Sequence, residues 1–221
     1  TVINGIQKAR EDAKEKYGIS SLLIMSYLRH LSEEDAFETL EQSLPYKHLI
    51  KAVGLDSSEK GNPPSKFQKV FEVSIKEGYV PVAHAGEEGP AEYIWEALDL
   101  LKIARIDHGN NCLTDEVLVK RLVNDKIALT VCPLSNLELK VVDDLKDHPL
   151  KKMLNLGLKA TVNSDDPAYF GGYMNANFLQ TAEALDLTKE DVKTLVKNSF
   201  EYSLLSDDEK QKYLIQVENF E

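Results

Sequence analysis

The chain has 221 residues, and its 43% hydrophobic content is enough for one large domain or two small ones with a real core. With 26 basic and 37 acidic residues and no basic cluster, the net charge of −11 argues against binding to a nucleic-acid backbone. Only two cysteines occur, without paired-motif spacing, which favours a reducing, cytoplasmic compartment. No apolar run approaches the roughly 18 residues of a membrane span, so no membrane partner is expected.

Helices and buried strands are expected to alternate along most of the chain. An amphipathic helix opens it, later helices begin near residues 32, 67, 91, 114 and 150, and only helix is expected from Asn175 onwards. The expected strands are Leu22–Tyr27, Leu49–Val53, Val80–Ala83, Ala104–Ile106, Ile127–Val131 and Lys159–Val162. Apolar strands joined by amphipathic helices require right-handed crossovers, which predicts an α/β fold with a parallel sheet.

Polar residues follow almost every expected strand, and this decides between two kinds of parallel sheet. No Gly-x-Gly-x-x-Gly follows the first strand, which weakens a doubly wound nucleotide fold. The strand-end groups are Arg29-His30, Asp56-Ser57-Ser58, His84 with Glu87, His108, Ser135-Asn136 and Asp165-Asp166. Such groups converge in a (β/α)8 TIM-type barrel, whose active site lies at that face. Only about six of the eight β/α units can be counted.

Five of these residues form a set of nitrogen and oxygen groups suited to a metal centre. They are His84, Glu87, His108, Asp165 and Asp166. Taken singly, a histidine can be a hydrogen-bonded strand-end residue, and an Asp-Asp-Pro sequence can be an ordinary turn. Taken together, they favour a catalytic zinc site, because zinc accepts imidazole and carboxylate ligands and keeps one position for water.

Four motifs resemble those of the adenosine and adenine deaminases, a family of metal-dependent amidohydrolase barrels. They are HAGE at 84–87, RIDHG at 105–109, CPLSN at 132–136 and NSDDP at 163–167, and their order and spacing also match. The resemblance implies that His84 and Asp165 bind zinc and that Glu87 shuttles a proton. It further implies that His108 is the base that orients the hydroxide and that Asp166 contacts the purine and the hydroxide.

The segment Gly54–Phe67 looks like the adenine deaminase branch, which implies conversion of adenine to hypoxanthine and ammonia in purine salvage. Attack on C6 pushes electrons onto N1, so Glu87 would need a raised pKa to donate a proton there. Ser57 and Ser58 are expected to bind the far edge of the ring. Two alternatives stay open: a deaminase of adenosine or N6-substituted adenine, and an inactive truncated barrel that acts only as a binding fragment.

One departure from the family concerns the metal ligands. The family carries a His-x-His pair on its first strand, and no such pair exists among the five histidines here. We therefore expect residues 1–221 to be a single domain, the carboxyl-terminal part of a longer enzyme with one zinc. The site would be incomplete here, with the missing amino-terminal segment and possibly a second subunit as partners. The other histidines and both cysteines are expected to be structural or, for the histidines, at the surface.

Overall fold

The computed structural model describes residues 2–220 and confirms the alternation of strands and helices. The strands are β1 Leu23–Leu28, β2 Ile50–Asp56, β3 Val80–Ala85, β4 Arg105–His108, β5 Ala128–Val131 and β6 Lys159–Val162. The helices are α1 Val2–Tyr17, α2 Glu33–Ser43, α3 Gln68–Lys76, α4 Ala91–Asp99, α5 Glu116–Asn124, α6 Pro133–Glu138, α7 Leu150–Asn155, α8 Pro167–Phe170, α9 Met174–Ala184, α10 Lys189–Glu201 and α11 Asp207–Glu218.

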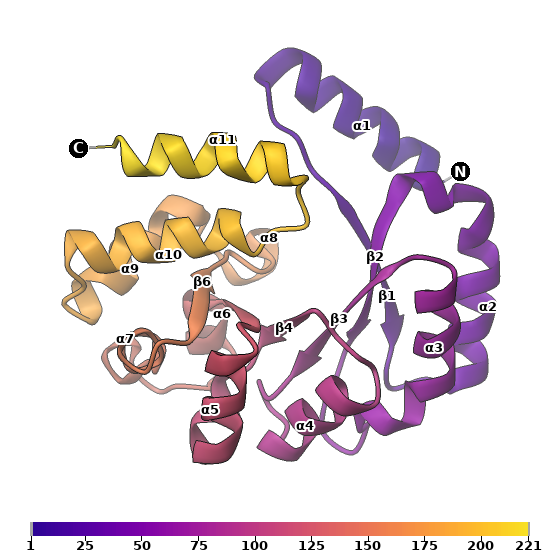
Figure 1. Cartoon of the computed structure of the whole chain (residues 1–221), viewed down its shortest axis with the longest axis horizontal. Helices are drawn as coiled ribbons and strands as arrows, with labels where there is room; N and C mark the ends of the chain where they lie inside the picture. The colour runs from indigo at the N-terminus through magenta and orange to yellow at the C-terminus, as the bar shows by residue number, and fades with distance from the viewer. Residues whose placement is uncertain (1, 221) are drawn as a thin grey trace.

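The six strands form one parallel sheet in which every strand lies beside its neighbour in sequence. The order is β1-β2-β3-β4-β5-β6, without a switch of direction. A doubly wound sheet would place its first strand in the interior and reverse direction there, whereas sequential order is the winding of a barrel. The sheet is therefore a curved part of a barrel, and helices α2, α3, α4 and α5 form an arc outside it (Figure 1).

The core lies between the sheet and these outer helices. Phe71 of α3, Ile94 of α4 and Leu122 of α5 are fully buried beneath their strands. Each follows from a one-sided apolar stripe, because a helix on a sheet buries only the face turned towards it. Truncation of such a side chain to alanine typically costs about 2–5 kcal/mol. This shell fixes the strands, and with them the residues that follow each strand.

The expected strand starts lie within one residue of the observed ones, but three strand ends were placed two or three residues too early. β2 runs to Asp56 instead of Val53, β3 to Ala85 instead of Ala83, and β4 to His108 instead of Ile106. These extensions continue the parallel ladder with a neighbouring strand, where Leu28 is paired with Asp56 and Ala85 with His108. A short helix, α6, also begins at Pro133, where no helix was predicted.

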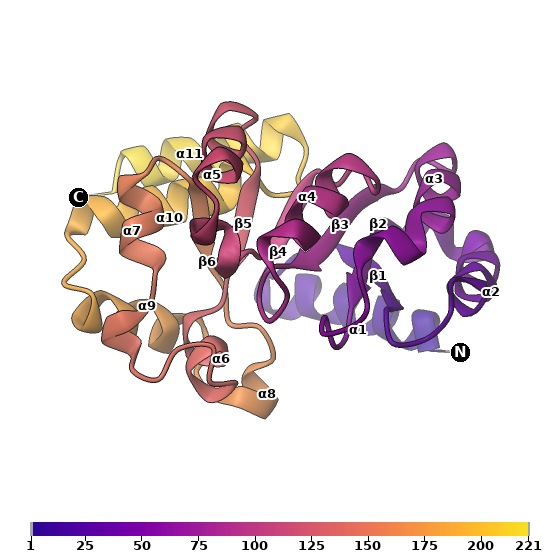
Figure 2. The same cartoon turned by 90° about the horizontal axis from the view of Figure 1, so that it is seen from below.

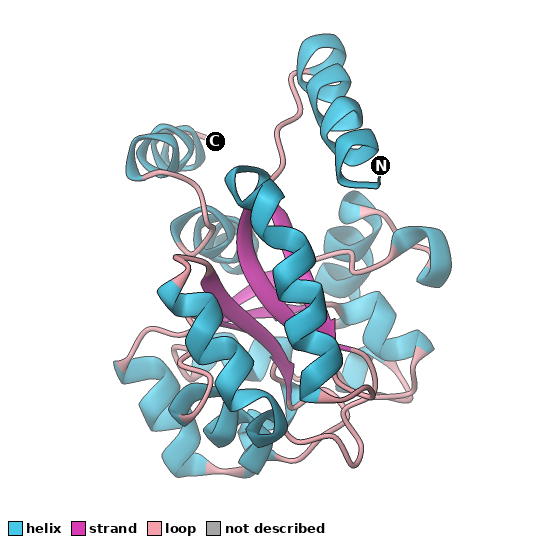
Figure 3. Ribbon diagram, turned by 90° about the vertical axis from the view of Figure 1, so that its right-hand side faces the viewer, coloured by secondary structure: helices cyan, strands magenta, loops and turns pink. Residues whose placement is uncertain are grey.

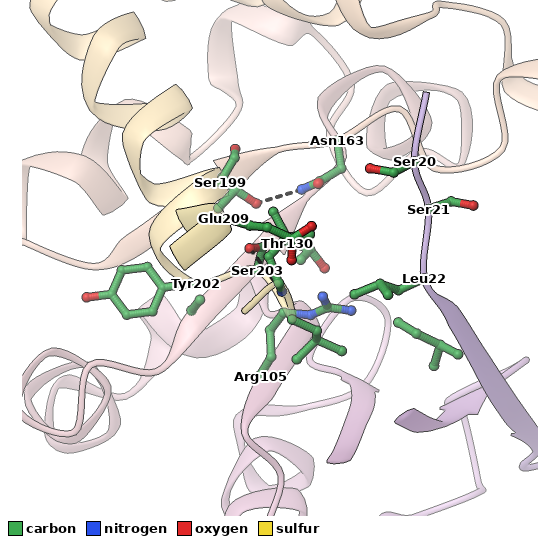
Figure 4. Close-up of a pocket in the computed structure, with 15 residues that line it drawn as sticks. Ser20, Ser21, Leu22, Arg105, Thr130, Asn163, Ser199, Tyr202, Ser203 and Glu209 are labelled. Atoms are coloured by element: carbon green, nitrogen blue, oxygen red, sulfur yellow. Dashed lines mark hydrogen bonds between the residues drawn. The ribbon is translucent and has the colours of Figure 1, made fainter. Parts of the chain in front are cut away.

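Strands β1 and β6 are the two edges of the sheet among residues 2–220. A hollow of about 380 Å³ separates the approach to β1 from the carboxyl-terminal helices. Figure 4 shows Ser20, Ser21 and Leu22 on one side of it and Asn163 and Tyr202 on the other. The two edges thus face a gap in the ring of strands, as the count of six units predicts.

The helices nearest the two ends of the chain lie outside the core. Neither α1 nor α11 contains a buried residue. Figure 3 shows these two helices lying apart, above the body that surrounds the strands. In the described part of the chain, none of the helices combines the length and the apolar character that a membrane span requires.

Candidate active site

Four strand ends bring potential metal ligands to one edge of the sheet. His84 lies in β3, His108 ends β4, Cys132 follows β5 and Asp165 follows β6. All four line a hollow of about 450 Å³, together with Asp107 and others. The carboxyl ends of parallel strands share one edge, which is why residues far apart in sequence meet there. Figure 2 shows α6 and α8, which follow β5 and β6, together on one side of these strands.

The His84 ring is held by the neighbouring strand β2. Its Nδ1 lies 2.9 Å from Asp56 Oδ1 and 3.2 Å from the Leu55 carbonyl oxygen. Burial lowers the pKa of His84, but the hydrogen bond and charge of Asp56 outweigh burial and raise it to about 9. With Nδ1 facing two acceptors, Nε2 is the nitrogen left to bind a metal, and metal uptake would release a proton.

His108 occupies a strained position in a buried setting. Its φ of 66° and the φ of 80° at Gly109 place two successive residues in the left-handed region. Only glycine fits at 109, because a Cβ there would lie 2.2 Å from Leu129 Cδ2. Burial, followed by repulsion from His84, lowers the pKa of His108 to about 4, so the ring is neutral at pH 7. The strain fits a functional site.

The Glu87 carboxyl group is enclosed beside His108. Its Oε1 lies 3.3 Å from His108 Nδ1 and accepts a 2.9 Å hydrogen bond from Asn136 Nδ2. Burial raises the pKa of Glu87 to about 7, although the charge of His84 opposes this shift. A carboxylic acid with a pKa near the working pH is suited to donate and recover a proton.

The two aspartates after β6 have different surroundings. Asp165 has a φ of 56° and accepts a 2.7 Å hydrogen bond from Ser135 Oγ. Its carboxylate lies with ligand atoms of His108 and Cys132 inside a group whose members are all within 4.8 Å of one another. Asp166 is exposed and caps α8, where its Oδ1 accepts from the backbone N–H of Tyr169 at 3.3 Å. Asp166 therefore lies at the rim of the hollow and does not line it.

The two serines predicted to contact substrate lie farther out. Ser57 is exposed, and its Oγ forms a 2.7 Å hydrogen bond with Nδ1 of the exposed His30. Ser58 is also exposed, and neither serine lines the hollow. The structure thus gathers His84, Glu87, His108 and Asp165 but leaves these serines outside the group.

A buried ion pair supports the loop that carries Glu87. Arg29 is fully buried 3.6 Å from Glu59, and its Nη1 donates to the His84 carbonyl at 2.8 Å. Glu59 in turn accepts from the backbone N–H groups of Glu88 and Gly89. The pair therefore joins the loops after β1, β2 and β3. Because each ion would be costly alone, the pair holds these loops in one arrangement.

Three residues important to this geometry were given no role at the site by sequence reasoning. Asp56 orients His84, Asn136 binds Glu87, and buried Cys132 lies beside Asp165. Asp56 and Asn136 were recognised as strand-end polar residues, but their contacts with His84 and Glu87 were not predicted. The expectation for Cys132 went no further than a buried thiol, and that part is confirmed. His148, expected to be structural or at the surface, is buried and hydrogen-bonded.

The donor atoms at this edge fit a zinc ion. They include the Nδ1 of His108, which is buried without a hydrogen-bond partner among residues 2–220. His84 lies against it, with 4.7 Å between the two ring centroids. Imidazole nitrogen and carboxylate oxygen are ligands that zinc accepts, and a thiol is a third. The site therefore has suitable ligand chemistry within one small hollow.

Comparison with known proteins decides the family. The sequence profile described as adenosine deaminase matches residues 1–220. The chain belongs to the adenosine deaminase family. Among relatives of this family, the adenine deaminase of Acinetobacter baylyi is 61% identical over 216 residues, and that of Sphingopyxis alaskensis is 58% identical over 220 residues. These matches cover 98% and 100% of this chain but only 65% and 64% of the relatives, so the chain spans about two thirds of their length.

Solved structures of the family agree with the fold. The adenine deaminase of Arthrobacter aurescens matches with a TM-score of 0.96 at 49% identity, covering 99% of this chain and 67% of that protein. An amidohydrolase of Burkholderia ambifaria, crystallised with bound zinc, matches with a TM-score of 0.91 at 26% identity. That match covers 97% of this chain and 60% of the other. The predicted partial barrel of the amidohydrolase kind is confirmed.

Proposed function

We propose that this chain carries the proton-transfer half of an adenine deaminase, which hydrolyses adenine to hypoxanthine and ammonia. The observation that carries the proposal is the meeting of Glu87, His84 and His108 at the ends of β3 and β4, with the Glu87 carboxyl enclosed. The high identity to adenine deaminases across almost the whole chain supports the choice of substrate. In this proposal, residues 1–221 form the carboxyl-terminal part of the barrel.

One zinc ion would be held by His84 and Asp165, together with ligands from outside these 221 residues. Nitrogen and oxygen donors at this edge support the assignment. When bound, zinc supplies Lewis acidity that makes water a nucleophile near neutral pH. Asp56 would keep the His84 ring in the orientation that leaves Nε2 free.

Glu87 and His108 would divide the proton transfers between them. The neutral His108 ring can accept a proton from the attacking water as its oxygen bonds to C6 of the purine. Electrons then move onto N1, which receives the proton of Glu87. The proton held by His108 passes to the amino group, ammonia leaves C6, and the hydroxyl proton on C6 returns to Glu87, so that the sum is adenine plus water giving hypoxanthine plus ammonia.

The remaining assignments concern the recognition of the purine. Asp166 would accept from a purine N–H with its Oδ2, because its Oδ1 already caps α8. Ser57 and Ser58 would reach the far edge of the ring only if their exposed loop turned towards the hollow. A cytoplasmic enzyme is consistent with both cysteines being free and buried. Assembly into a homo-oligomer is a further part of the proposal.

The substrate can be tested by comparing purines side by side. The full-length protein that contains these residues should deaminate adenine with a higher kcat/KM than adenosine or N6-methyladenine, measured by the change in ultraviolet absorbance. An equal or higher kcat/KM for adenosine would favour the first alternative. No turnover of any of the three by a zinc-loaded protein would favour the inactive binding fragment.

A further inference from the structure

A chain of buried side chains leads from the main chain of α7 to the carboxyl group of Glu87. The backbone N–H of Leu150 donates to Nδ1 of His148 at 3.2 Å. Nε2 of His148 lies 3.2 Å from Oδ1 of Asn136, and Nδ2 of Asn136 lies 2.9 Å from Oε1 of Glu87. A second amide, Asn110 Nδ2, donates to the same Asn136 oxygen at 2.8 Å.

The backbone N–H at the far end fixes the direction of every bond in this chain. Because His148 Nδ1 accepts from Leu150, the proton of the neutral ring must be on Nε2. Nε2 therefore donates, and the Asn136 atom that faces it must be the oxygen. A reversed Asn136 amide would place its NH2 group against two other donors, those of His148 and Asn110. The amide nitrogen of Asn136 is thus forced towards Glu87.

The hydrogen bond from Asn136 gives the two oxygens of the Glu87 carboxyl group different surroundings. Oε1 faces the Asn136 N–H and lies 3.3 Å from His108 Nδ1. The lone pair of Oε1 that faces Asn136 is occupied by this bond, so the acid proton of Glu87 cannot point towards Asn136. The carboxyl group is therefore held by Oε1, and its proton lies on a side of the group away from Asn136.

Burial makes this arrangement rigid and separates it from the substrate. Asn136 is fully buried, and His148 and Asn110 are 3% and 6% exposed. None of the three lines the hollow at the strand ends. They belong to three separate segments, since Asn110 follows β4, Asn136 lies in α6 and His148 precedes α7. Their contribution to the reaction must therefore pass through Glu87.

We propose that Asn136, oriented by His148 and Asn110, is a positioning residue that holds the Glu87 carboxyl group by Oε1 and keeps its catalytic proton turned away from Asn136, towards the purine. This inference rests on the proposed deaminase function. It adds two residues, Asn136 and His148, whose side chains touch neither metal nor substrate. Misdirection of a catalytic group by about 1 Å can cost about 100-fold in rate.

The first experiment compares kinetics of the zinc-loaded, full-length enzyme with adenine. Asn136→Ala should lower kcat about 10–100-fold and leave KM within about threefold and zinc content unchanged. His148→Ala should act in the same direction, and His148→Gln should restore much of the rate, because a glutamine N–H can donate to Asn136. Asn198→Ala is the matched control: it removes a buried amide that donates to the Ala160 carbonyl at 2.8 Å, far from Glu87, and should leave kcat unchanged.

A double-mutant cycle separates positioning from general damage to the fold. In a Glu87→Gln background, Asn136→Ala should cause little further loss, because the group it positions is already removed. An equal loss in both backgrounds would overturn the proposal, as would a kcat within threefold of wild type for Asn136→Ala. If the unsubstituted enzyme does not turn over adenine, the proposed function and this role both fail. If only the Asn136 variant behaves like wild type, the positioning role fails and the proposed function stands.

The tautomer of His148 provides a test that needs no activity. Nitrogen-15 spectra of histidine-labelled full-length protein, with the His148→Gln variant for assignment, should show the proton on Nε2 at pH 7. A proton on Nδ1 would reverse the direction of the network and overturn the proposal, even if the alanine variants failed to fold.

Discussion

The surroundings of Glu87 and Asp166 differ more than those of any other pair of candidate acids. Glu87 is enclosed by groups from β4, α6 and the loop it belongs to, and one of its oxygens has a fixed donor. Asp166 is exposed and caps a helix of four residues. The carboxyl group of Glu87 is therefore organised by contacts among the described residues, whereas the only side-chain bond of Asp166 among residues 2–220 is to the start of α8.

The position of each strand in the sheet explains this difference. β3, β4 and β5 have a partner on both sides and a helix packed against them, whereas β6 has a strand on one side only. A residue at the end of an interior strand meets neighbours from both directions. Among residues 2–220, Asp165 at the edge receives a single side-chain hydrogen bond, from Ser135.

The largest effect should come from testing residues 1–221 alone. In the proposed site, His84 and Asp165 would supply two of the three or four groups that a catalytic zinc requires, and the edges of β1 and β6 are prone to association. We expect a metal-poor, inactive and aggregating protein. Elemental analysis, size-exclusion chromatography and an adenine assay would check this. A monomer with one zinc and normal turnover would show that residues 1–221 already contain a complete zinc site.

Glu87→Gln in the full-length enzyme should abolish deamination while zinc stays bound. The amide cannot donate the proton, and general acid catalysis typically contributes about 10²–10⁴-fold. Turnover and zinc content would be measured on the same preparation. Activity within about tenfold of wild type would remove Glu87 from the proton-transfer role.

Arg29→Met should destabilise the loop that carries Glu87. It leaves buried Glu59 without its cation and the His84 carbonyl without its donor, and such a change typically costs about 3–5 kcal/mol. Urea unfolding would measure the loss. Lys197→Met, which breaks the exposed pair with Glu218, is the control and should have little effect. Similar losses in the two variants would contradict a special role for the buried pair.

His148 should make the fold sensitive to acid. Burial lowers its pKa to about 4 from an ordinary value of 6.5. Between these values the unfolded chain binds a proton that the folded chain does not, so this stability is present above pH 6.5 and is lost as the pH falls towards 4. The loss should reach about 1.4 kcal/mol per pH unit. The free energy of unfolding, plotted against pH from 4.5 to 7, should have a shallower slope for His148→Gln than for the unsubstituted protein. Equal slopes would contradict the lowered pKa of His148.

The smallest effect is expected for Asp165, which follows the edge strand β6. Ser135→Ala removes the one hydrogen bond to Asp165 and should cost about 1 kcal/mol, because the buried serine makes no other side-chain bond among residues 2–220. Zinc affinity should fall about tenfold, since the carboxylate loses its orienting donor. Titration with a chelator would compare the two proteins. An unchanged affinity would mean that Asp165 is positioned by the groups outside this chain.

The sequence was sufficient for the strands because burial on both faces produces long apolar runs. Val80–Ala83 and Lys159–Val162 could be placed within two residues of their true ends for that reason. The gathering of His84, His108 and Asp165 followed, because the ends of parallel strands share one edge. Local pattern could therefore predict which residues meet.

Pattern could not predict how the side chains are oriented after the strands end. Pro133 begins α6, and successive helical residues point about 100° apart, so Ser135 turns to Asp165 and Asn136 to Glu87. The contact between Asn136 and Glu87 joins residues 49 positions apart. Such a contact depends on the packing of α6, not on any local signal. The same holds for Asp166, whose side chain caps α8 instead of facing the hollow.

The sequential order of the strands also has a consequence for biosynthesis. Each strand that leaves the ribosome finds its partner already made, so the sheet can grow by one strand at a time along a single edge. β6 begins 136 residues after β1, which corresponds to roughly 7–27 s at about 5–20 residues per second. Glu87 and its loop emerge about midway through that interval, and Asp165 follows just after its end. In the proposed site the acid is thus synthesised before the metal ligand, and a nascent chain stalled between Asn136 and Asp165 would hold an enclosed carboxyl group with no Asp165 to help bind zinc.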